Sequence, residues 1–183
     1  MYTKFWIPGT DSELDDLFEI LRQKHYNDES HRLHNNYSRE SFAEVSVLSI
    51  TFENDEPVMV SSILNRDCWP DRAYRICNRA WKVKEYRLEQ ASVLGPSPMF
   101  AEMVMSHVEY VRQNLDYSLL FISRQTSNWQ RFGARSFEKY GLEFKYDDYK
   151  YLTCSNENDE SCWQHIMYIG DDDTLTNWKR KLT

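Results

Sequence analysis

The sequence predicts an α/β fold in which a single mixed, mostly antiparallel sheet is flanked by helices. Two observations carry this prediction. Apolar residues recur at helical spacing in several segments, and between these segments lie runs rich in β-branched and aromatic residues. The order along the chain is helix, hairpin, strand, helix, strand, helix, hairpin, and one mixed sheet accommodates that order most economically.

The amino-terminal third is expected to hold one helix and one hairpin. Residues 10–13, Thr-Asp-Ser-Glu, form a capping box, and the apolar residues that follow repeat at helical spacing to about Lys24. The polar stretch 25–40 is expected to be a loop or a weak helix. Segments 41–52 and 57–64 are rich in Val, Ile and Phe and are joined by four polar residues, which predicts a β-hairpin.

The middle of the chain is expected to hold two strands separated by a long helix. Residues 73–83 alternate well enough for a strand, and 84–95 have no clear period and are expected to form a loop. Ser97 at the cap and Pro98 at the first position then begin a helix with an apolar stripe to Leu115. Segment 117–123 is a short apolar strand.

The carboxyl-terminal third is expected to hold a helix and a final hairpin. The helix spans about 129–140, and Gly141 suits its left-handed stop. Two strands, about 142–154 and 162–169, are separated by an acidic loop, and the tail 170–183 is expected to be a weak helix or an extension. Since neither a repeat nor a linker interrupts the chain, residues 1–183 are expected to form a single domain.

Composition excludes several function classes. Hydrophobic residues make up 41% of the 183 residues and charged residues 28%, which is typical of a globular protein. No apolar run approaches the ~20 residues of a membrane helix, and the first eight residues lack signal-peptide features, so we expect a cytoplasmic protein without membrane partners. The net charge of −7 and the absence of a basic helix argue against a nucleic-acid partner.

The cysteines and histidines do not form a metal-binding motif. None of the four cysteines, Cys68, Cys77, Cys154 and Cys162, forms a Cys-x-x-Cys pair, and free thiols are expected in a reducing compartment. A disulfide between Cys154 and Cys162, which flank an expected hairpin loop, is the alternative. His25, His31 and His34 lack zincin spacing and are assigned to a polar loop, so no metal is expected. His107 and His165 are expected to be packing residues.

One local motif suggests a family. Residues 130–142, Gln-Arg-Phe-Gly-Ala-Arg-Ser-Phe-Glu-Lys-Tyr-Gly-Leu, resemble the carboxyl-terminal signature of the GCN5-related N-acetyltransferase (GNAT) superfamily, and the element order over residues 1–170 is similar as well. The resemblance implies that two neighbouring strands diverge and admit acetyl-CoA, whose acetyl group passes to a small amine or a protein amino group. It also implies a pyrophosphate site at the start of the helix after the fourth strand, which a helix amino terminus favours.

The resemblance assigns candidate residues one by one. The expected cofactor-binding residues are Ala91, Ser92, Val93, Leu94, Gly95, Ser97 and Gln130. Val93 stands where the family's phosphate loop has glycine, and Phe137 stands where many members have the tyrosine that protonates the departing thiolate. Tyr140 is therefore the candidate acid, and Glu89 is the candidate general base.

Two further functions remain open. A degenerate GNAT-like binding, sensor or viral accessory protein would keep the fold without the chemistry, and a relative of the acyl-homoserine-lactone synthases would share the fold. Six basic residues between Arg72 and Arg87 suit a phosphorylated or acyl-CoA ligand, or else form a charged outer face. Trp69, Pro70 and Trp163 line a cleft or belong to the core. The oligomeric state is expected to be a monomer or a homodimer.

Overall fold

The computed structural model describes residues 1–26, 46–83, 96–124, 127–178 and 180–181. The chain divides into two compact units. We call them unit 1, which comprises Met1–Leu64 and Cys77–Gln90, and unit 2, which comprises Asn65–Ile76 and Ala91–Thr183. One strand contributes residues to both units.

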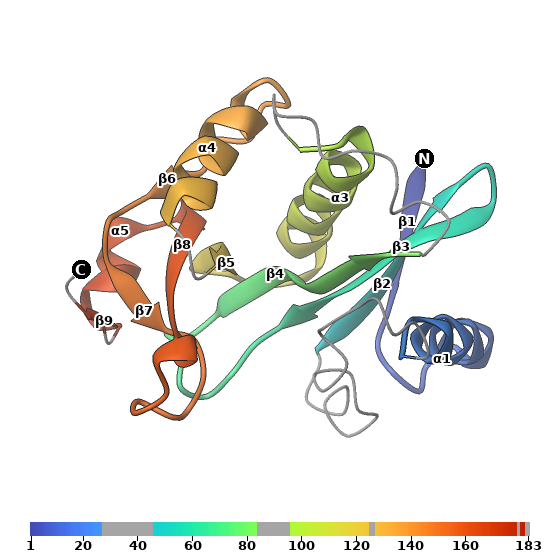
Figure 1. Ribbon diagram of the computed structural model, residues 1–183, viewed down its shortest axis with the longest axis horizontal. Coiled ribbons are helices and arrows are strands. Elements are labelled where there is room, and N and C mark those ends of the chain that lie inside the picture. Colours follow the sequence, from blue (N-terminus) through green and yellow to red (C-terminus); the bar gives the residue numbers. More distant parts are fainter. Residues whose placement is uncertain (27–45, 84–95, 125–126, 179, 182–183) are drawn as a thin grey trace. The chain divides into compact units, whose positions relative to one another are not determined.

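Unit 1 is an antiparallel ribbon with one helix (Figure 1). Its elements are β1 (Tyr2–Trp6), α1 (Ser12–Tyr26), β2 (Val47–Glu53), β3 (Glu56–Leu64) and the second part of β4 (Ala73–Lys82). The predicted hairpin is present, and its turn residues Asn54 and Asp55 have φ of 51° and 65°. Such positive values are required by the turn type that matches the twist of a two-residue hairpin.

Strand β1 was missed by the sequence analysis. It pairs antiparallel with β2 from Tyr2↔Phe52 to Trp6↔Leu48. It lies at the edge of the sheet and most of its residues are at least partly exposed, so it lacks the buried alternation by which a strand is usually detected.

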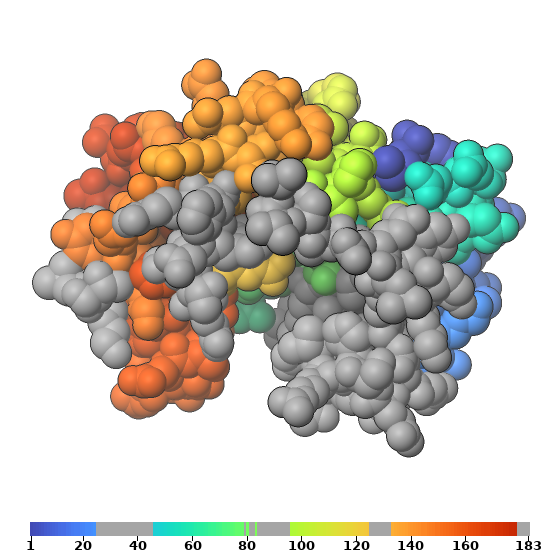
Figure 2. Space-filling view, turned by 45° about the horizontal axis from the view of Figure 1, so that its top comes forward, coloured from blue at the N-terminus to red at the C-terminus, as the bar shows by residue number. Residues whose placement is uncertain are grey.

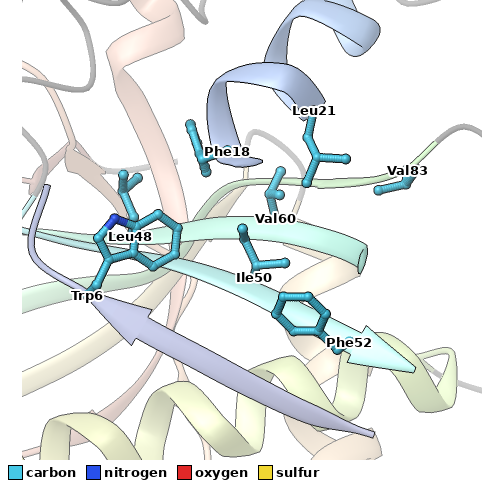
Figure 3. Packing of buried hydrophobic residues seen from close by; sticks show 8 residues of the cluster. All are labelled: Trp6, Phe18, Leu21, Leu48, Ile50, Phe52, Val60 and Val83. Atoms are coloured by element: carbon cyan, nitrogen blue, oxygen red, sulfur yellow. The ribbon is translucent and has the colours of Figure 1, made fainter. Parts of the chain in front are cut away.

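The core of unit 1 is an apolar cluster between α1 and the strands. Figure 3 shows Phe18 and Leu21 of α1 pointing toward the strand residues of the cluster. The cluster consists of Trp6, Phe18, Leu21, Leu48, Ile50, Phe52, Val60 and Val83. Phe18 meets the ring of Trp6 edge-on, with centroids 6.0 Å apart, a favoured geometry for aromatic pairs. Burial of these side chains is the main stabilising term of this unit.

Unit 2 contains the remaining helices and strands. They are α3 (Pro98–Asn114), β5 (Leu119–Arg124), α4 (Ser127–Glu138), β6 (Lys145–Tyr146), β7 (Lys150–Leu152), β8 (Trp163–Gly170), α5 (Asp172–Thr176) and β9 (Arg180–Lys181), together with the first part of β4. In Figure 1, α3 and α4 lie on the same side of β5. The buried residues of α3 recur at helical spacing, which confirms the predicted apolar stripe.

The strand order is β1-β2-β3-β4-β5-β8-β7-β9, and β6 pairs with β8. Strands β4 and β5 are parallel, whereas the pairs β1–β2, β2–β3, β5–β8, β6–β8, β7–β8 and β7–β9 are antiparallel. The predicted mixed, mostly antiparallel sheet is therefore confirmed. The single domain expected from the length of the chain stays a prediction.

The strand predicted over 142–154 is wrong in its continuity. The structure has two short strands instead, β6 and β7, with Asp147 between them. One carboxylate oxygen of Asp147 accepts from the Tyr149 amide at 3.0 Å, and the other accepts from the Tyr151 hydroxyl at 2.6 Å. This local turn competes with the strand for the backbone.

Of the two expectations for the tail after residue 170, the weak helix is the one that the structure confirms. The tail contains α5 and β9, and it places Trp178, 4% exposed, against the rings of Phe121 and Tyr151 with centroids 5.1 and 5.0 Å away. Lys145 Nζ lies 3.0 Å from Asp172 Oδ1, and in Figure 2 the orange segment after α4 adjoins the red carboxyl-terminal segment. The tail is therefore part of the core of unit 2.

The expectation of free thiols is wrong for two of the four cysteines. Cys154 and Cys162 are joined in a disulfide, with their Cα atoms 5.2 Å apart, within the usual range for such bonds. Cys68 is free and exposed, and Cys77 is free and buried. Spacing alone could place the pair across a loop, but it could not decide the redox state.

Candidate functional site

The parallel ladder between β4 and β5 is short. It contains three pairs, from Ala73↔Leu119 to Arg75↔Phe121, although β4 runs on to Lys82 and β5 to Arg124. All three pairs join residues of unit 2, and the divergence expected beyond them stays a prediction. Cys77, two residues after the last pair, has φ of 53°, which is unusual for a non-glycine residue.

The conformation of Cys77 interrupts the regular geometry of β4. In a regular strand Arg75, Cys77 and Arg79 would share one face, but the positive φ of Cys77 departs from that geometry. The alternation is interrupted, so the shared face of Arg75 and Arg79 cannot be derived from their spacing. The side chain of Arg79 lies outside the described part of the structure.

A polar group within unit 2 lies at the end of this ladder. Arg75 donates to Gln164 Oε1 at 3.4 Å, and Ser123 donates to the same oxygen at 2.7 Å. Gln164 in turn donates to the Ser161 carbonyl at 3.0 Å, which fixes the orientation of its amide. A half-buried guanidinium held in this way can bind a carbonyl, carboxylate or phosphate oxygen of a ligand. Ser123 and Gln164 were not identified from the sequence.

The basic segment predicted around Arg75 is not one continuous feature. Arg72 is exposed and lies 2.8 Å from the carboxylate of Asp116, as expected for a charged outer face. Arg75 belongs to the polar group with Gln164. Lys84 and Arg87 fall outside the described residues.

The start of α3 has the geometry predicted for it. Ser97 caps the helix by accepting from the Phe100 amide at 3.3 Å, and Pro98 occupies the first helical position. No acidic side chain lies in the first turn. The helix dipole at this end is thus available to an anion. Ala91, Ser92, Val93, Leu94 and Gly95, which precede it, lie outside the described residues, as does Glu89.

Helix α4 carries the motif on which the resemblance rests. Phe137 is fully buried, with ring centroids 6.3 Å from Phe100, 6.3 Å from Tyr140 and 5.5 Å from Phe144. It is a core residue with no proton to donate. Tyr140 lies just beyond the helix and is half-buried, with Lys139 Nζ 5.0 Å from its ring centroid. Gln130 lies in α4, but its side chain is not among those described.

The two histidines within unit 2 are buried. Burial lowers the pKa of His107 to about 3, so this side chain is neutral at physiological pH. The pKa of His165 is lowered mainly by burial and further by nearby Lys150. Both are placed as the packing residues that the sequence suggested. Among the described residues, no group of three or more His, Cys, Asp or Glu side chains could hold a metal ion.

A cavity of about 410 Å³ lies within unit 2. Its apolar wall is formed by Trp69, Pro70, Leu152 and Trp178. The two tryptophans meet Phe121 edge-on at 5.0 and 5.1 Å, and Phe121 is the residue paired with Arg75. Of the cleft candidates from the sequence, Trp69 and Pro70 line this cavity. The contribution of Trp178 was not foreseen, because its segment was regarded as a tail.

The fold is similar to that of several solved acyltransferases. An acyl-CoA N-acyltransferase from Pseudomonas aeruginosa aligns with a TM-score of 0.53 at 11% identity over 91% of this chain and 97% of its own. A protein from Bacteroides thetaiotaomicron assigned to the GNAT family of acetyltransferases aligns with a TM-score of 0.52 at 14% identity over 95% and 90%. An acetyltransferase from Bacillus subtilis, solved in complex with CoA, aligns with a TM-score of 0.50 at 11% identity over 92% and 97%.

The sequence itself provides no comparable match. No protein-family model matches it, and no curated protein matches it significantly. The structural similarity therefore establishes the fold. Within the described part of the chain, no helix is both long and apolar enough to span a membrane.

Proposed function

We propose that this chain, which has the GNAT fold, is an N-acetyltransferase that uses acetyl-CoA and acts on a small amine or a protein amino group. The observation that carries the proposal is the structural alignment with an acyl-CoA N-acyltransferase over 91% of this chain and 97% of that one. The Bacillus subtilis acetyltransferase of similar fold, solved in complex with CoA, supports the choice of ligand. The short β4–β5 ladder is consistent with it.

Residues at the start of α3 are proposed to hold the phosphates of CoA. The capped helix amino terminus at Ser97 and the absence of acidic residues in the first turn support this assignment. Ala91, Ser92, Val93, Leu94, Gly95 and Gln130 remain proposed cofactor contacts. Acetyl-CoA would supply a thioester whose acetyl carbon forms a bond to the amine nitrogen while the bond to sulfur breaks. Much of the catalysis would then be positioning of the amine.

Glu89 and Tyr140 keep their proposed roles as base and acid. Glu89 would take the proton that the amine loses, and Tyr140 would donate a proton to the departing thiolate. Tyr140→Phe, which keeps the ring that contacts Phe137, is the matched variant for this role. A drop in kcat without a change in CoA affinity would support the assignment.

A second candidate is a binding or sensor protein without catalysis. It is favoured by Phe137, a fully buried ring at the position where many family members carry a tyrosine. The two candidates differ in one measurement, which is the release of thiol from acetyl-CoA in the presence of amines.

The test begins with binding. Thermal unfolding is measured with acetyl-CoA and with desulfo-CoA, and ligand at a hundredfold excess over Kd should stabilise the protein by about 2.7 kcal/mol. The absence of a shift with either ligand would reject the proposal. If both ligands bind, thiol release with a panel of small amines and peptides separates an enzyme from a sensor.

Position 97 offers a sharper test of the phosphate site. Ser97→Asp keeps a good helix cap but adds a negative charge where the phosphates are expected, so CoA affinity should fall about tenfold or more while the helix stays stable. Ser97→Asn is the matched control, because it caps equally well without the charge. Equal CoA affinity in the two variants would place the phosphates elsewhere.

A cytoplasmic location and a monomeric or homodimeric state are also part of the proposal. The disulfide between Cys154 and Cys162 is the observation that opposes the cytoplasmic assignment, because such bonds are rare in reducing compartments. Alkylation of free thiols in freshly lysed cells, followed by mass spectrometry, measures which form of the pair the cell contains.

A further inference from the structure

The cavity of unit 2 has the size and composition of a small-molecule site. Its volume of about 410 Å³ is within the range of ligand pockets, and its wall combines two indole rings with Pro70 and Leu152. Three segments contribute to it, namely the residues before β4, the segment that begins at Leu152 in β7, and the residues after α5. Ser155, Glu157 and Asn177 also line it, so the cavity suits a flat apolar group that has a polar end.

Two buried donors beside this wall lack an acceptor. Among the described residues, Trp69 Nε1 and Arg66 Nε have no hydrogen-bond partner, although both atoms are shielded from solvent. The indole of Trp69 is 5% exposed, and the guanidinium carbon of Arg66 lies 5.9 Å from its ring centroid. By contrast, Trp178 Nε1 donates to the Leu152 carbonyl at 3.0 Å. An unpaired buried donor costs free energy that a suitable acceptor would recover.

We propose that the cavity binds a small molecule with a flat apolar body and a carbonyl-type oxygen, either a carboxylate or an amide. The apolar body packs against Trp69 and Trp178, and the oxygen accepts from Trp69 Nε1 and from Arg66. Arg66 is held for this role by its second donor, which reaches the Thr153 carbonyl at 3.4 Å. This inference is independent of acetyl transfer.

The charges around the cavity favour an acceptor over a cation. The guanidinium carbon of Arg66 lies 5.9 Å from the ring centroid of Trp69, so a ligand cation would meet a like charge near this wall. Glu157 lines the cavity as well, but it is exposed, and solvent screening weakens its attraction for a cation. A protonated amine carries only N–H donors, which cannot pair with the N–H groups of Trp69 and Arg66. The buried N–H donors of Trp69 and Arg66 therefore favour a ligand with an acceptor oxygen over a cation.

A matched series of ligands tests the class. The probes are 3-phenylpropionate, 3-phenylpropionamide and phenethylamine, which share the ring and its two-carbon spacer. Binding is measured by calorimetry and by protection of Cys68, an exposed free thiol that lines the cavity, from alkylation. We expect the carboxylate and the amide to bind and to slow alkylation, and the amine to bind at least about tenfold more weakly. Equal or tighter binding of the amine, or no binding of any probe, overturns the proposal.

Single substitutions test the two donors. Trp69→Phe removes the indole N–H but keeps a flat ring, and the affinity for 3-phenylpropionamide should fall about tenfold. Trp6→Phe is the matched control, because Trp6 is also 5% exposed but lies in unit 1, and its affinity should stay within twofold. Arg66→Lys keeps the charge and removes the Nε donor, and it provides a second measurement if Trp69→Phe folds poorly. Unchanged affinity in both Trp69→Phe and Arg66→Lys contradicts the proposal.

Discussion

Trp6 in unit 1 and Trp69 in unit 2 are equally buried, each 5% exposed, but their indole N–H groups differ in hydrogen bonding. Trp6 Nε1 donates to Asp15 Oδ1 at 2.8 Å, and the second oxygen of that carboxylate accepts from the Gly9 amide at 2.8 Å. Trp69 Nε1 has no acceptor among the described residues. Buried polar groups are normally paired, so the exception needs a reason, and the adjacent cavity supplies one.

The same contrast extends to other buried polar groups of the two units. In unit 1, Ser61 and Ser62 both donate to the Asn78 carbonyl at 3.2 Å, and the Asn78 amide donates to Ser62 at 2.9 Å. These groups are neutral and satisfy one another. Unit 2 instead buries the ionisable His107, and Trp69 Nε1 and Arg66 Nε have no acceptor among the described residues. The unpaired donors Trp69 Nε1 and Arg66 Nε are thus the departures that lie beside the proposed ligand site.

The largest expected effects come from removing one core ring in each unit. Phe18→Ala in unit 1 and Phe121→Ala in unit 2 each delete a buried ring and should lower the free energy of unfolding by about 3–5 kcal/mol. Of these two residues, Phe121 is the one that contacts the tryptophans of the cavity. Phe121→Ala should therefore also abolish binding of 3-phenylpropionamide, whereas Phe18→Ala should not. Denaturant unfolding and calorimetry measure the two effects. Loss of binding in Phe18→Ala would contradict the assignment of ligand binding to unit 2.

Reduction of the disulfide should affect unit 2 alone. Cys154 and Cys162 are separated by 8 positions, and a loop of that length should contribute about 2–3 kcal/mol by restricting the unfolded chain. Hydrogen exchange with and without reductant should show faster exchange around β7 and β8 and no change in β1 to β3. Cys68→Ser is the control, since this exposed thiol is not bonded and its loss should not alter stability.

Lowering the pH should destabilise unit 2 through its buried His107. The pKa of His107 is lowered by burial from about 6.5 to about 3, so its contribution to stability is complete above pH 6.5 and is lost as the pH falls toward 3. Between pH 7 and pH 5 the loss from this group should be about 2 kcal/mol. His107→Leu should remove that part of the acid sensitivity, as measured by denaturant unfolding at both values. An unchanged pH dependence would assign acid sensitivity to other groups.

The fold was largely predictable because its signals are local. The polar residues 10–13 and the cap at Ser97 located two helices to within a few residues, and the polar residues 53–56 located the hairpin. The predicted capping box is wrong in detail, because Asp11 accepts from the Leu14 amide at 3.0 Å while the Thr10 hydroxyl donates to the Ile7 carbonyl. Strand β1 was missed because an edge strand needs no buried face. The strand predicted over 142–154 was interrupted by hydrogen bonds of Asp147, which no periodicity reveals.

The proposed ligand site was less predictable than the fold. Trp69 and Pro70 were candidates from the sequence, but Arg66, Leu152 and Trp178 join them only through tertiary packing. Whether an indole N–H finds an acceptor depends on neighbours distant in the chain, and Thr153 lies 87 positions from Arg66. Polar groups at the end of the β4–β5 ladder, Ser123 and Gln164, were missed for the same reason.

The smallest expected effect tests the opening comparison directly. Both Trp6→Phe and Trp69→Phe shrink an equally buried ring, but Trp6→Phe also removes a donor that Asp15 uses, so it should lower the free energy of unfolding by about 1–2 kcal/mol more than Trp69→Phe does. Denaturant unfolding of both variants measures the difference at equal burial. If Trp69→Phe proved as costly as Trp6→Phe, the Trp69 N–H would have a partner in the folded protein, and the reason for placing an acceptor ligand beside it would disappear.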